Sequence, residues 1–335
     1  MKVLLYTESE KIVGKSGLGK AIRHQEMALS RNNIEYTRNK KDTYDILHIN
    51  TYFPASYLMA KKAKKTGHKI VYHAHSTEED YKNGFIFAKQ TSKLFKKWLI
   101  KCYSLGDVLV TPTPYSKQLL ESYGMNKKIY AISNGIDLEK FKKNPKDKQK
   151  FREKYGYSKD DKVIIGIGLY IERKGIVDFV ELAKRMPDYK FIWFGYSPLA
   201  ASSENVKKAV HTKLDNLTFA GYVEQEDICC AMNGCDLYLF PTLEETEGIP
   251  VIEACACHCP ALIRDIPVFS GWLEDGVNIY KAKNLDEFES KIKKIINHDL
   301  PDLTKEAYKV AYDRRIEKIG QELREVYEYV MTEKK

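Results

Sequence analysis

The chain has 335 residues, of which 43% are hydrophobic and 30% are charged, and its formal net charge is +9. This composition excludes a disordered chain, and the length predicts roughly two domains of ordinary size. Residues 1–150 carry 29 Lys and Arg against 14 Asp and Glu, a balance of +15, whereas residues 151–335 carry 26 against 32, a balance of −6. A basic N-terminal half predicts a polyanionic partner, either nucleic acid or an anionic membrane surface.

The N-terminal half alternates predicted strands with helical segments. Residues 2–6 predict a first strand, residues 14–19 form a glycine-rich turn, and residues 20–32 have helical spacing. Further buried strands are predicted over residues 44–49, 69–73, 107–110 and 129–132. A lysine-rich stretch at 142–150 predicts a linker region, part of which can be helical.

The same alternation restarts in the second half. Strands are predicted over residues 163–168, 191–195, 217–220, 237–240 and 261–263, and helices over 175–186, from 251 onward and over 304–330. Repeated alternation of strand and helix predicts an α/β fold with two doubly wound domains, each built on a parallel sheet.

Two glycine-rich segments resemble nucleotide-binding loops, but each lacks one required residue. Residues 14–21 nearly match the phosphate loop of ATP- and GTP-binding proteins, yet Ala21 stands where a hydroxyl must hold magnesium. Gly166 and Gly168 begin a dinucleotide-binding pattern, but Ile171 replaces its third glycine. We therefore expect neither a nucleoside triphosphatase nor a nicotinamide dehydrogenase. The first loop can still direct backbone N–H groups at a phosphate or a sugar, or form only a tight turn.

Two glutamates flank a predicted helix start in the second half. The free N–H groups near Gly248 and Ile249 can bind an anion. Glu245 precedes this helix and Glu253 lies one turn inside it, so both carboxylates can face one ligand. One can accept two hydrogen bonds from a ribose diol, and the other can bond a sugar hydroxyl. Taken alone, the pair could also be solvated charges at a helix start.

The glutamate pair resembles the E-x7-E signature of family four retaining glycosyltransferases, which have the GT-B fold. Other segments that resemble motifs of this family are the loop with Gly17 and Gly19, His75 at the end of a strand, the sequence N-G-I-D at 134–137, and the basic pair Arg173 and Lys174. The family usually has an arginine where this chain has Leu169, so Arg173 beside Lys174 supplies the second positive charge.

The resemblance implies two Rossmann-like domains that face each other across a cleft. Residues 1–140 would bind acceptor and membrane, residues 141–315 would bind a nucleotide sugar, and a helix over 316–335 would pack back towards the N-terminal domain. The implied catalytic residues are His75, Glu245, Arg173 and Lys174, and the implied donor-binding residues are Gly17, Gly19, Arg173, Lys174, Gly248, Ile249 and Glu253. The reaction would retain the α-configuration, with fixed cations stabilising the departing diphosphate.

We expect no metal site and no tightly bound cofactor. The chain lacks a D-x-D triad through which a metal would bridge the diphosphate, although Mg²⁺ could stimulate the enzyme. The cluster Cys255, Cys257, His258 and Cys259 has the wrong spacing for structural zinc, and its cysteines are expected to be buried small residues. Cysteines crowded between 229 and 259 are typical of a cytosolic protein and not of a disulfide framework.

Residues 81–106 contain no acidic side chain, and residues 85–103 divide into an apolar and a lysine-rich helical face. Such a helix is a candidate for interfacial membrane binding, or an ordinary surface helix whose apolar stripe packs on the core. The predicted membrane-contacting residues are Phe87, Lys89, Lys93, Leu94, Phe95, Lys96, Lys97, Trp98 and Lys101. The lysines at 61–69 would extend this basic surface. No nucleic-acid motif accompanies it, so nucleic acid is not expected.

Within the family, the length and the first residues resemble bacterial diglycosyl-diacylglycerol synthases. This resemblance implies transfer of a hexose from UDP-galactose or UDP-glucose, with galactose slightly favoured, to α-monoglucosyl-diacylglycerol. The enzyme would be peripheral, on the cytoplasmic face of the cell membrane. The alternatives are a soluble family member in polysaccharide or glycoconjugate synthesis, and a non-catalytic protein that binds a membrane surface.

Overall fold

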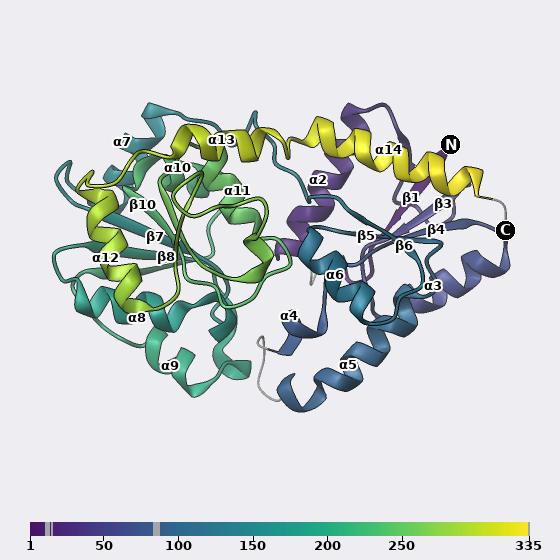
Figure 1. Ribbon diagram of the computed structural model, residues 1–335, viewed down its shortest axis with the longest axis horizontal. Helices are drawn as coiled ribbons and strands as arrows, with labels where there is room; N and C mark the ends of the chain where they lie inside the picture. Colours follow the sequence, from purple (N-terminus) through teal and green to yellow (C-terminus); the bar gives the residue numbers. More distant parts are fainter. Residues whose placement is uncertain (11–13, 15, 83–87, 334–335) are drawn as a thin grey trace. The chain divides into compact units, whose positions relative to one another are not determined.

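A computed structural model describes residues 1–10, 14, 16–82 and 88–333, which form two compact units (Figure 1). Unit 1 comprises Met1–Tyr81, Gln90–Asp137 and Arg314–Lys335, and unit 2 comprises Lys82–Lys89 and Leu138–Asp313. The chain therefore leaves unit 1 and returns to it with its last helix, as the resemblance to GT-B enzymes predicts.

Unit 1 is built on a parallel sheet with the strand order β2-β1-β3-β4-β5-β6. Its strands are β1 (Lys2–Tyr6), β2 (Glu35–Thr37), β3 (Ile46–Ile49), β4 (Lys69–His73), β5 (Val108–Thr111) and β6 (Lys128–Ala131). Its helices are α2 (Gly17–Arg31), α3 (Pro54–Lys65), α4 (Glu78–Lys82), α5 (Ala88–Tyr103), α6 (Pro114–Ser122) and α14 (Ile316–Thr332). This is the doubly wound arrangement predicted from the sequence.

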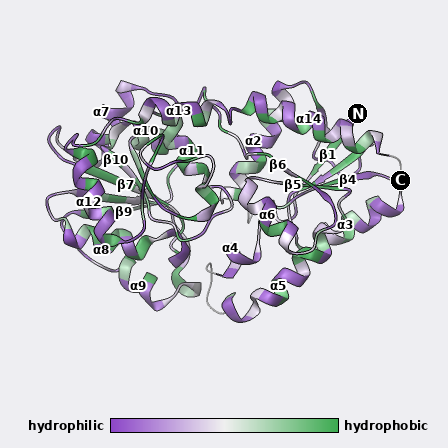
Figure 2. Ribbon diagram, viewed as in Figure 1, coloured by the Kyte–Doolittle hydropathy of each residue, from purple (hydrophilic) through white to green (hydrophobic). Residues whose placement is uncertain are grey.

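Alternate strand residues of unit 1 point to two separate apolar cores, because side chains change face at each residue of a strand. One core joins Leu4, Leu47, Ile70 and Leu109 to side chains of α3, α5 and α6. The other joins Val3, Ile46, Val71 and Val108 to side chains of α2 and α14. Figure 2 shows the strands of both sheets as mainly hydrophobic, as expected for parallel strands that are covered on both faces.

Helix α14 packs closely on α2 (Figure 1). A Cβ added to Gly320 would lie 2.4 Å from the carbonyl oxygen of Ala28, so this approach requires glycine. The sequence predicted one helix over 304–330, but the structure has α13 (Thr304–Tyr312) and then α14. Between them, Ile136 N donates to Arg314 O and Ile316 N donates to Ile136 O, so the backbone pairs with residue 136 instead of continuing the helix.

Unit 2 repeats the architecture with the strand order β12-β11-β10-β7-β8-β9. Its strands are β7 (Val163–Ile167), β8 (Lys190–Phe194), β9 (Leu217–Gly221), β10 (Leu237–Phe240), β11 (Ala261–Arg264) and β12 (Tyr280–Ala282). Its other helices are α7 (Pro145–Tyr155), α8 (Ile176–Arg185), α9 (Glu204–Val210), α10 (Gln225–Gly234), α11 (Ile249–Ala256) and α12 (Leu285–Ile296), with short 3-10 turns η1 (Glu172–Lys174), η2 (Leu199–Ala201) and η3 (Pro267–Phe269). Within the described ranges, no helix combines the length and apolarity needed to cross a membrane.

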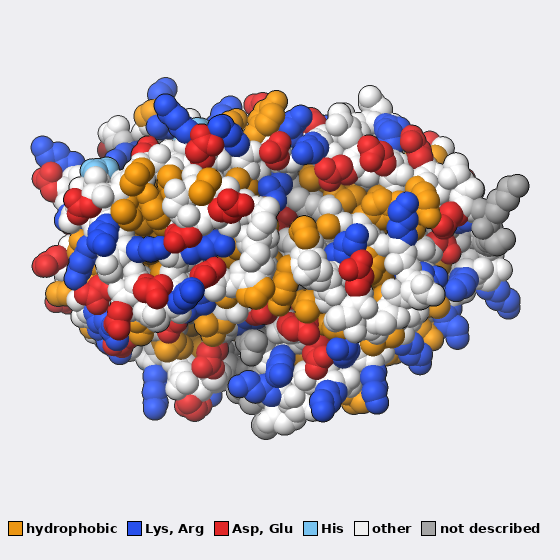
Figure 3. Space-filling model, viewed as in Figure 1, with side chains coloured by type: hydrophobic (Ala, Val, Ile, Leu, Met, Phe, Trp, Pro, Cys, Tyr) orange, Lys and Arg blue, Asp and Glu red, His pale blue; other side chains and the backbone are white. Residues whose placement is uncertain are grey.

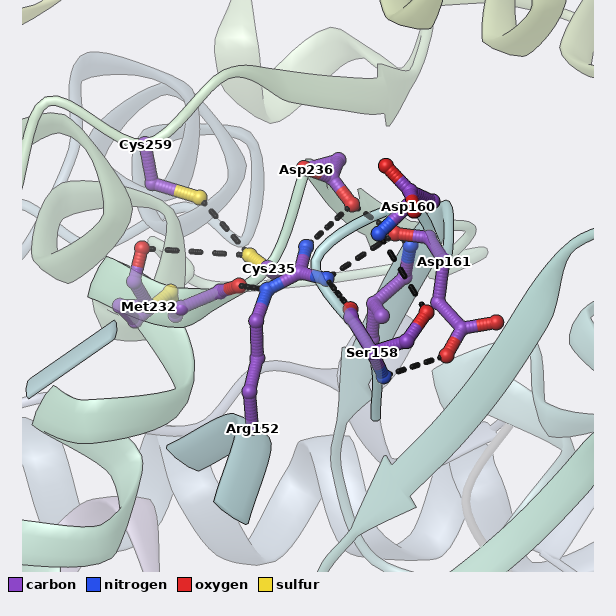
Figure 4. A network of polar contacts seen from close by, with 10 residues as sticks. Arg152, Ser158, Asp160, Asp161, Met232, Cys235, Asp236 and Cys259 are labelled. Atoms are coloured by element: carbon purple, nitrogen blue, oxygen red, sulfur yellow. Dashed lines mark hydrogen bonds and ion pairs between the residues drawn. The ribbon is translucent and has the colours of Figure 1, made fainter. Parts of the chain in front are cut away.

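A buried arginine ties α7 to the amino ends of two strands in unit 2 (Figure 4). Arg152 Nη2 donates to Asp236 Oδ2 over 2.8 Å, and its other nitrogens donate to carbonyl oxygens of Ser158, Asp161 and Gly234. Asp236 Oδ2 also accepts from Val163 N over 2.7 Å. The Arg152 guanidinium therefore satisfies backbone oxygens that would otherwise lack partners at the start of β7 and β10.

We predict that Arg152→Met lowers the free energy of unfolding of unit 2 by about 3 kcal/mol, because it removes one partner of a largely buried ion pair. Urea unfolding followed by tryptophan fluorescence measures this loss, since Trp193 lies in the core of unit 2. The matched control is Arg185→Met, which breaks an exposed pair with Asp286 and should cost less than about 1 kcal/mol. Equal losses in the two variants would contradict the structural role of Arg152.

Candidate active site

The predicted donor-binding residues of unit 2 lie on two loops that follow adjacent parallel strands. The turn η1 follows β7, and residues 241–248 follow β10, which pairs with β7. Gly175 permits close contact between the loops, since a Cβ there would lie 2.1 Å from the Pro241 carbonyl oxygen. Leu243 N donates to Arg173 O over 2.7 Å, so the backbones are joined directly. The carboxyl edge of a parallel sheet is where such folds bind ligands.

A cluster of three ionised side chains connects these loops. Lys174 Nζ donates to Glu245 Oε1 over 2.5 Å, and Arg173 Nη1 lies 3.5 Å from Glu245 Oε2. Arg173 Nη1 also donates to Glu244 O over 2.7 Å. The structure thus brings together three of the predicted catalytic residues in one unit. Two cations share one carboxylate, which leaves an excess of one positive charge among the three groups.

The Glu245 carboxyl is held in its ionised form although the cluster is largely buried. The side chains of Lys174, Arg173 and Glu245 are only 16%, 12% and 7% exposed. Burial opposes ionisation of the Glu245 carboxyl, but the charges of Lys174 and Arg173 outweigh it and hold its pKa below the ordinary value. Fixed charges of this kind can stabilise a developing anion with little reorganisation.

The helix that follows this loop begins as the sequence predicts. Gly248 is the N-cap of α11, with a φ of 91° that favours glycine, and Ile249 is the first helical residue. No side chain caps this end, so the helix start offers N–H groups to an anion. Glu253 lies one turn further along α11 and is fully buried, whereas an ordinary surface carboxylate would be solvated.

Two polar residues of this region were not identified from the sequence. The Thr242 hydroxyl is fully buried, and it lies 3.0 Å from Glu245 Oε1 and 3.0 Å from Arg173 O. Glu247 is a further buried carboxylate immediately before Gly248. Their only sequence signal is their place in the loop after β10, which does not distinguish a buried polar group from a solvated one.

In unit 1, His75 lies at the carboxyl edge of the sheet, two residues after the end of β4. Its Nε2 lies 3.0 Å from Asn50 Oδ1, and its ring stacks on that of His73 with 3.9 Å between the ring centres. Burial lowers the pKa of His75 well below the ordinary value, so the imidazole is neutral at physiological pH. The sequence identified His75 but missed Asn50, which follows the end of β3.

Gly17 and Gly19 lie in the first turn of α2, where backbone N–H groups have no helical partners. Ser16 is the N-cap, and its hydroxyl accepts a hydrogen bond from Gly19 N over 3.4 Å. Gly17 is exposed, and a Cβ there would meet no atom within 4 Å. A helix therefore follows the first strand as predicted, but it begins at Gly17, inside the predicted turn, and not at residue 20. Residues 11–13 and 15 of the same turn lie outside the described residues.

The lysines predicted on one side of α5 are mostly exposed. These are Lys89, Lys93, Lys97 and Lys101, and Leu94 beside them is 71% exposed. Lys61 and Lys101 lie 5.7 and 5.1 Å from the centre of the Tyr57 ring, so the lysines of α3 and α5 adjoin. We call this surface the basic face, and it consists of Lys61, Lys62, Lys64, Lys65, Lys93, Lys97 and Lys101. Figure 3 shows Lys and Arg side chains gathered over α3 and α5.

The aromatic side chains of α5 pack on unit 1. Trp98 Nε1 donates to Tyr52 O over 2.7 Å, and the Phe95 ring contacts Tyr52 and Tyr81. Lys96 is half-buried, and its ammonium lies 3.3 Å from Glu78. The other buried members of this stripe, Leu99, Cys102 and Tyr103, belong to the core. Lipid contact by α5 would therefore fall to Leu94 and the exposed lysines, and the predicted Phe87 lies outside the described residues.

The cysteines of unit 2 are buried side chains, apart from the half-buried Cys230. This confirms the prediction for Cys255, Cys257 and Cys259, and Cys259 Sγ lies 3.3 Å from Cys235 Sγ (Figure 4). Among the described residues, no group of three or more His, Cys, Asp or Glu side chains is arranged to hold a metal ion.

Comparison with known families and structures agrees with this geometry. Residues 147–314 match the model of glycosyl transferases group 1, and residues 20–140 match that of glycosyltransferase family 4. HepE of Anabaena, solved in complex with UDP-glucose, has a TM-score of 0.80 at 18% identity, covering 98% of this chain and 100% of that chain. This likeness shows that the two sheets form the GT-B fold.

Several curated relatives carry glycolipid names. The processive diacylglycerol alpha-glucosyltransferase of Acholeplasma laidlawii is 40% identical over the full length of both chains. The alpha-galactosylglucosyldiacylglycerol synthase of Streptococcus pneumoniae is 26% identical, covering 82% of this chain and 75% of that one. With both family models matched and a full-length relative at 40% identity, this chain belongs to the GT-B glycosyltransferases of family four and is a glycosyltransferase.

Proposed function

We propose that this enzyme transfers a hexose from a UDP-sugar to a diacylglycerol glycolipid, with retention of the α-configuration. The observation that carries the acceptor class is the 40% identity, over the full length of both chains, to a diacylglycerol glucosyltransferase. That relative also favours UDP-glucose as donor over the UDP-galactose slightly preferred from the sequence. α-Monoglucosyl-diacylglycerol is the proposed acceptor, and the product is then a diglycosyl-diacylglycerol.

The ion cluster of unit 2 is suited to the departing diphosphate. Lys174 and Arg173 bind the phosphate oxygens, and the start of α11 at Gly248 and Ile249 adds N–H donors. When phosphate arrives, Glu245 can exchange its ion pair with Lys174 for a hydroxyl of the transferred sugar. Glu253 holds the ribose hydroxyls. Apart from this exchange of partners by Glu245, the cations and the helix start are positioned by the fold, so little further reorganisation opposes the reaction.

In the proposed reaction, the acceptor hydroxyl attacks the anomeric carbon from the side of the leaving diphosphate. The bond from the anomeric carbon to the phosphate oxygen breaks as the bond to the acceptor oxygen forms. The hydroxyl proton passes to the departing phosphate, which serves as base. His75, which is neutral, contacts a hydroxyl of the sugar and places no positive charge beside the cationic anomeric carbon.

We further propose that the basic face binds the anionic leaflet that contains the acceptor, on the cytoplasmic face of the membrane. Support comes from the exposed lysines of α3 and α5 and from the apolar Leu58 and Leu94, which are 63% and 71% exposed. Lysines near an anionic surface each contribute about 1 kcal/mol, and this attraction weakens with salt. Binding by charge keeps the enzyme peripheral while the lipid tails of the acceptor stay in the bilayer.

The donor and acceptor can be identified directly. The enzyme is incubated with UDP-glucose or UDP-galactose and with α-monoglucosyl-diacylglycerol in micelles that contain an anionic lipid. The lipid products are then separated and identified by mass spectrometry. We expect a diglycosyl lipid, formed faster from UDP-glucose. Transfer only to water-soluble sugars would support the soluble alternative and would exclude the lipid acceptor.

Lys174→Met should lower kcat/KM by about 100- to 1,000-fold, because the diphosphate loses a fixed cation in a buried site. UDP release from the UDP-sugar gives the rate, and circular dichroism checks that the variant is folded. The control Lys184→Met removes an exposed lysine of α8 and should leave the rate unchanged. A loss of less than about threefold in Lys174→Met would exclude Lys174 from binding the diphosphate.

Reversing the charge of Lys93, Lys97 and Lys101 to Glu should weaken binding to anionic liposomes by at least about 100-fold, at about 1 kcal/mol for each lysine. Liposome flotation measures this binding. The matched control changes Lys142, Lys143 and Lys146 to Glu, which alters the net charge equally on exposed residues of unit 2. Similar losses in both triple variants would mean that net charge, and not the basic face, determines membrane binding.

A further inference from the structure

A polar network that includes His75 lies in unit 1, and its other side chains are buried. Its members are Gln25 of α2, His48 of β3, Asn50 after β3, His73 of β4, His75 itself and Tyr327 of α14. On the sheet face covered by α2 and α14, Ile46 and Val71 are apolar, and two residues later the same face presents His48 and His73. Polar groups thus replace the apolar core at the carboxyl ends of these strands.

The network has two amides at its centre. Asn50 Nδ2 donates to Gln25 Oε1 over 2.8 Å, and Asn50 Oδ1 lies 3.0 Å from His75 Nε2. On the other side, Gln25 Nε2 lies 2.9 Å from His48 Nε2 and 3.1 Å from His73 Nδ1. Both amides are almost fully buried, at 2% and 4% exposure, so water has little access to the bond between them.

The amide pair determines where the histidines carry their protons. A carbonyl oxygen only accepts and an NH₂ group only donates, and the two amides are joined through one group of each kind. Each amide has one remaining group that faces a histidine, and of these two groups one must be an acceptor and the other a donor. Asn50 offers an oxygen to His75, so His75 carries its proton on Nε2. Gln25 offers its NH₂ group to His48, so Nε2 of His48 accepts and its proton is on Nδ1.

The imidazoles must be neutral for this relation to apply. Burial lowers the pKa of His48 to about 3, and burial also lowers the pKa values of His73 and His75 well below the ordinary value. The far end of the network is fixed by Tyr327, whose hydroxyl lies 2.6 Å from His48 Nδ1. The stacking of His73 on His75 holds the plane of the second ring.

We propose that Asn50 and Gln25 are positioning residues that fix the tautomer of His75, so that His75 and His48 carry their protons on unlike ring nitrogens. With the proton on Nε2, His75 Nδ1 accepts a hydrogen bond from a hydroxyl of the donor sugar. This consequence rests on the proposed role of His75 in sugar contact. The tautomer relation itself depends only on the network.

Tautomers can be measured on the free enzyme by ¹H–¹⁵N correlation spectra of ¹⁵N-histidine-labelled protein at pH 7.5, with His48→Gln and His75→Gln used for assignment. We expect one tautomer at each site, Nε2–H for His75 and Nδ1–H for His48. Protons on like nitrogens, or a mixture of tautomers at His75, would overturn the proposal. If His75 instead carries its proton on Nδ1 and His48 carries its proton on Nε2, the two tautomers are still of opposite kind. His75 Nδ1 then cannot accept a hydrogen bond from the sugar, and its acceptor role is overturned.

Variants of Asn50 distinguish a role in positioning His75 from a role in folding of the protein. Asn50→Leu should release His75 into a mixture of tautomers and lower kcat/KM by about 10- to 100-fold. Asn50→Asp keeps an oxygen facing His75, so it should keep a proton on Nε2 of His75, but it removes the NH₂ group that bonds Gln25 and should release the tautomer of His48. In a His75→Ala background, Asn50→Leu should cause no further loss, because Asn50 acts through His75. An additive loss would make Asn50 merely structural. The spectra need neither donor nor lipid, so failure of the proposed acceptor leaves this test intact.

Discussion

The ion cluster of Glu245 with Lys174 and Arg173 depends on the pairing of β7 with β10. Because parallel neighbours end at the same edge of a sheet, the loops that follow them meet, although 71 residues separate Lys174 from Glu245. Gly175 lets the backbones touch, and Thr242 bonds across the junction. The position of α11 follows from the same loop, since Gly248 starts the helix that carries Glu253. The pairing of β7 with β10 therefore positions every predicted donor-binding group of unit 2.

The polar groups of the two units differ in charge. In unit 2 the groups are charged, and partial burial strengthens the attraction between them. In unit 1 the histidines are neutral, because burial lowers their pKa values below the physiological range and leaves one ring proton on each imidazole. A reaction that separates charge benefits from both arrangements. In the proposed reaction, the fixed cations of unit 2 would stabilise the departing diphosphate, and a neutral imidazole would not oppose positive charge at the anomeric carbon. This difference gives a physical reason for the asymmetric placement of charge.

The sequence predicted the buried strands well, because parallel strands covered on both faces are apolar throughout. The bounds of β1, β4 and β10 match those predicted from the apolar runs. The roles expected for Lys174 and Glu245 came from the family resemblance, and the structure brings the two side chains into contact. Asn50 was missed because a single polar residue after a strand end also occurs in solvated loops, and Gln25 because a single polar residue within a helix is usually solvated. Only folding shows that both are buried, with Gln25 against His48 and Asn50 against His75.

The helix break at 313–315 and the packing of α5 have a common explanation. Periodicity identifies an apolar stripe but not what covers it. The stripe of residues 304–330 is continuous in sequence, yet backbone pairing with Ile136 interrupts the helix. The stripe of α5 was equally compatible with lipid or with protein, and Trp98 bonds to Tyr52 within unit 1. Because the aromatic side chains of α5 pack on unit 1, the helix exposes its lysines and Leu94 to solvent. Any attraction to a membrane would then be mainly electrostatic, and therefore reversible and sensitive to the charge of the leaflet.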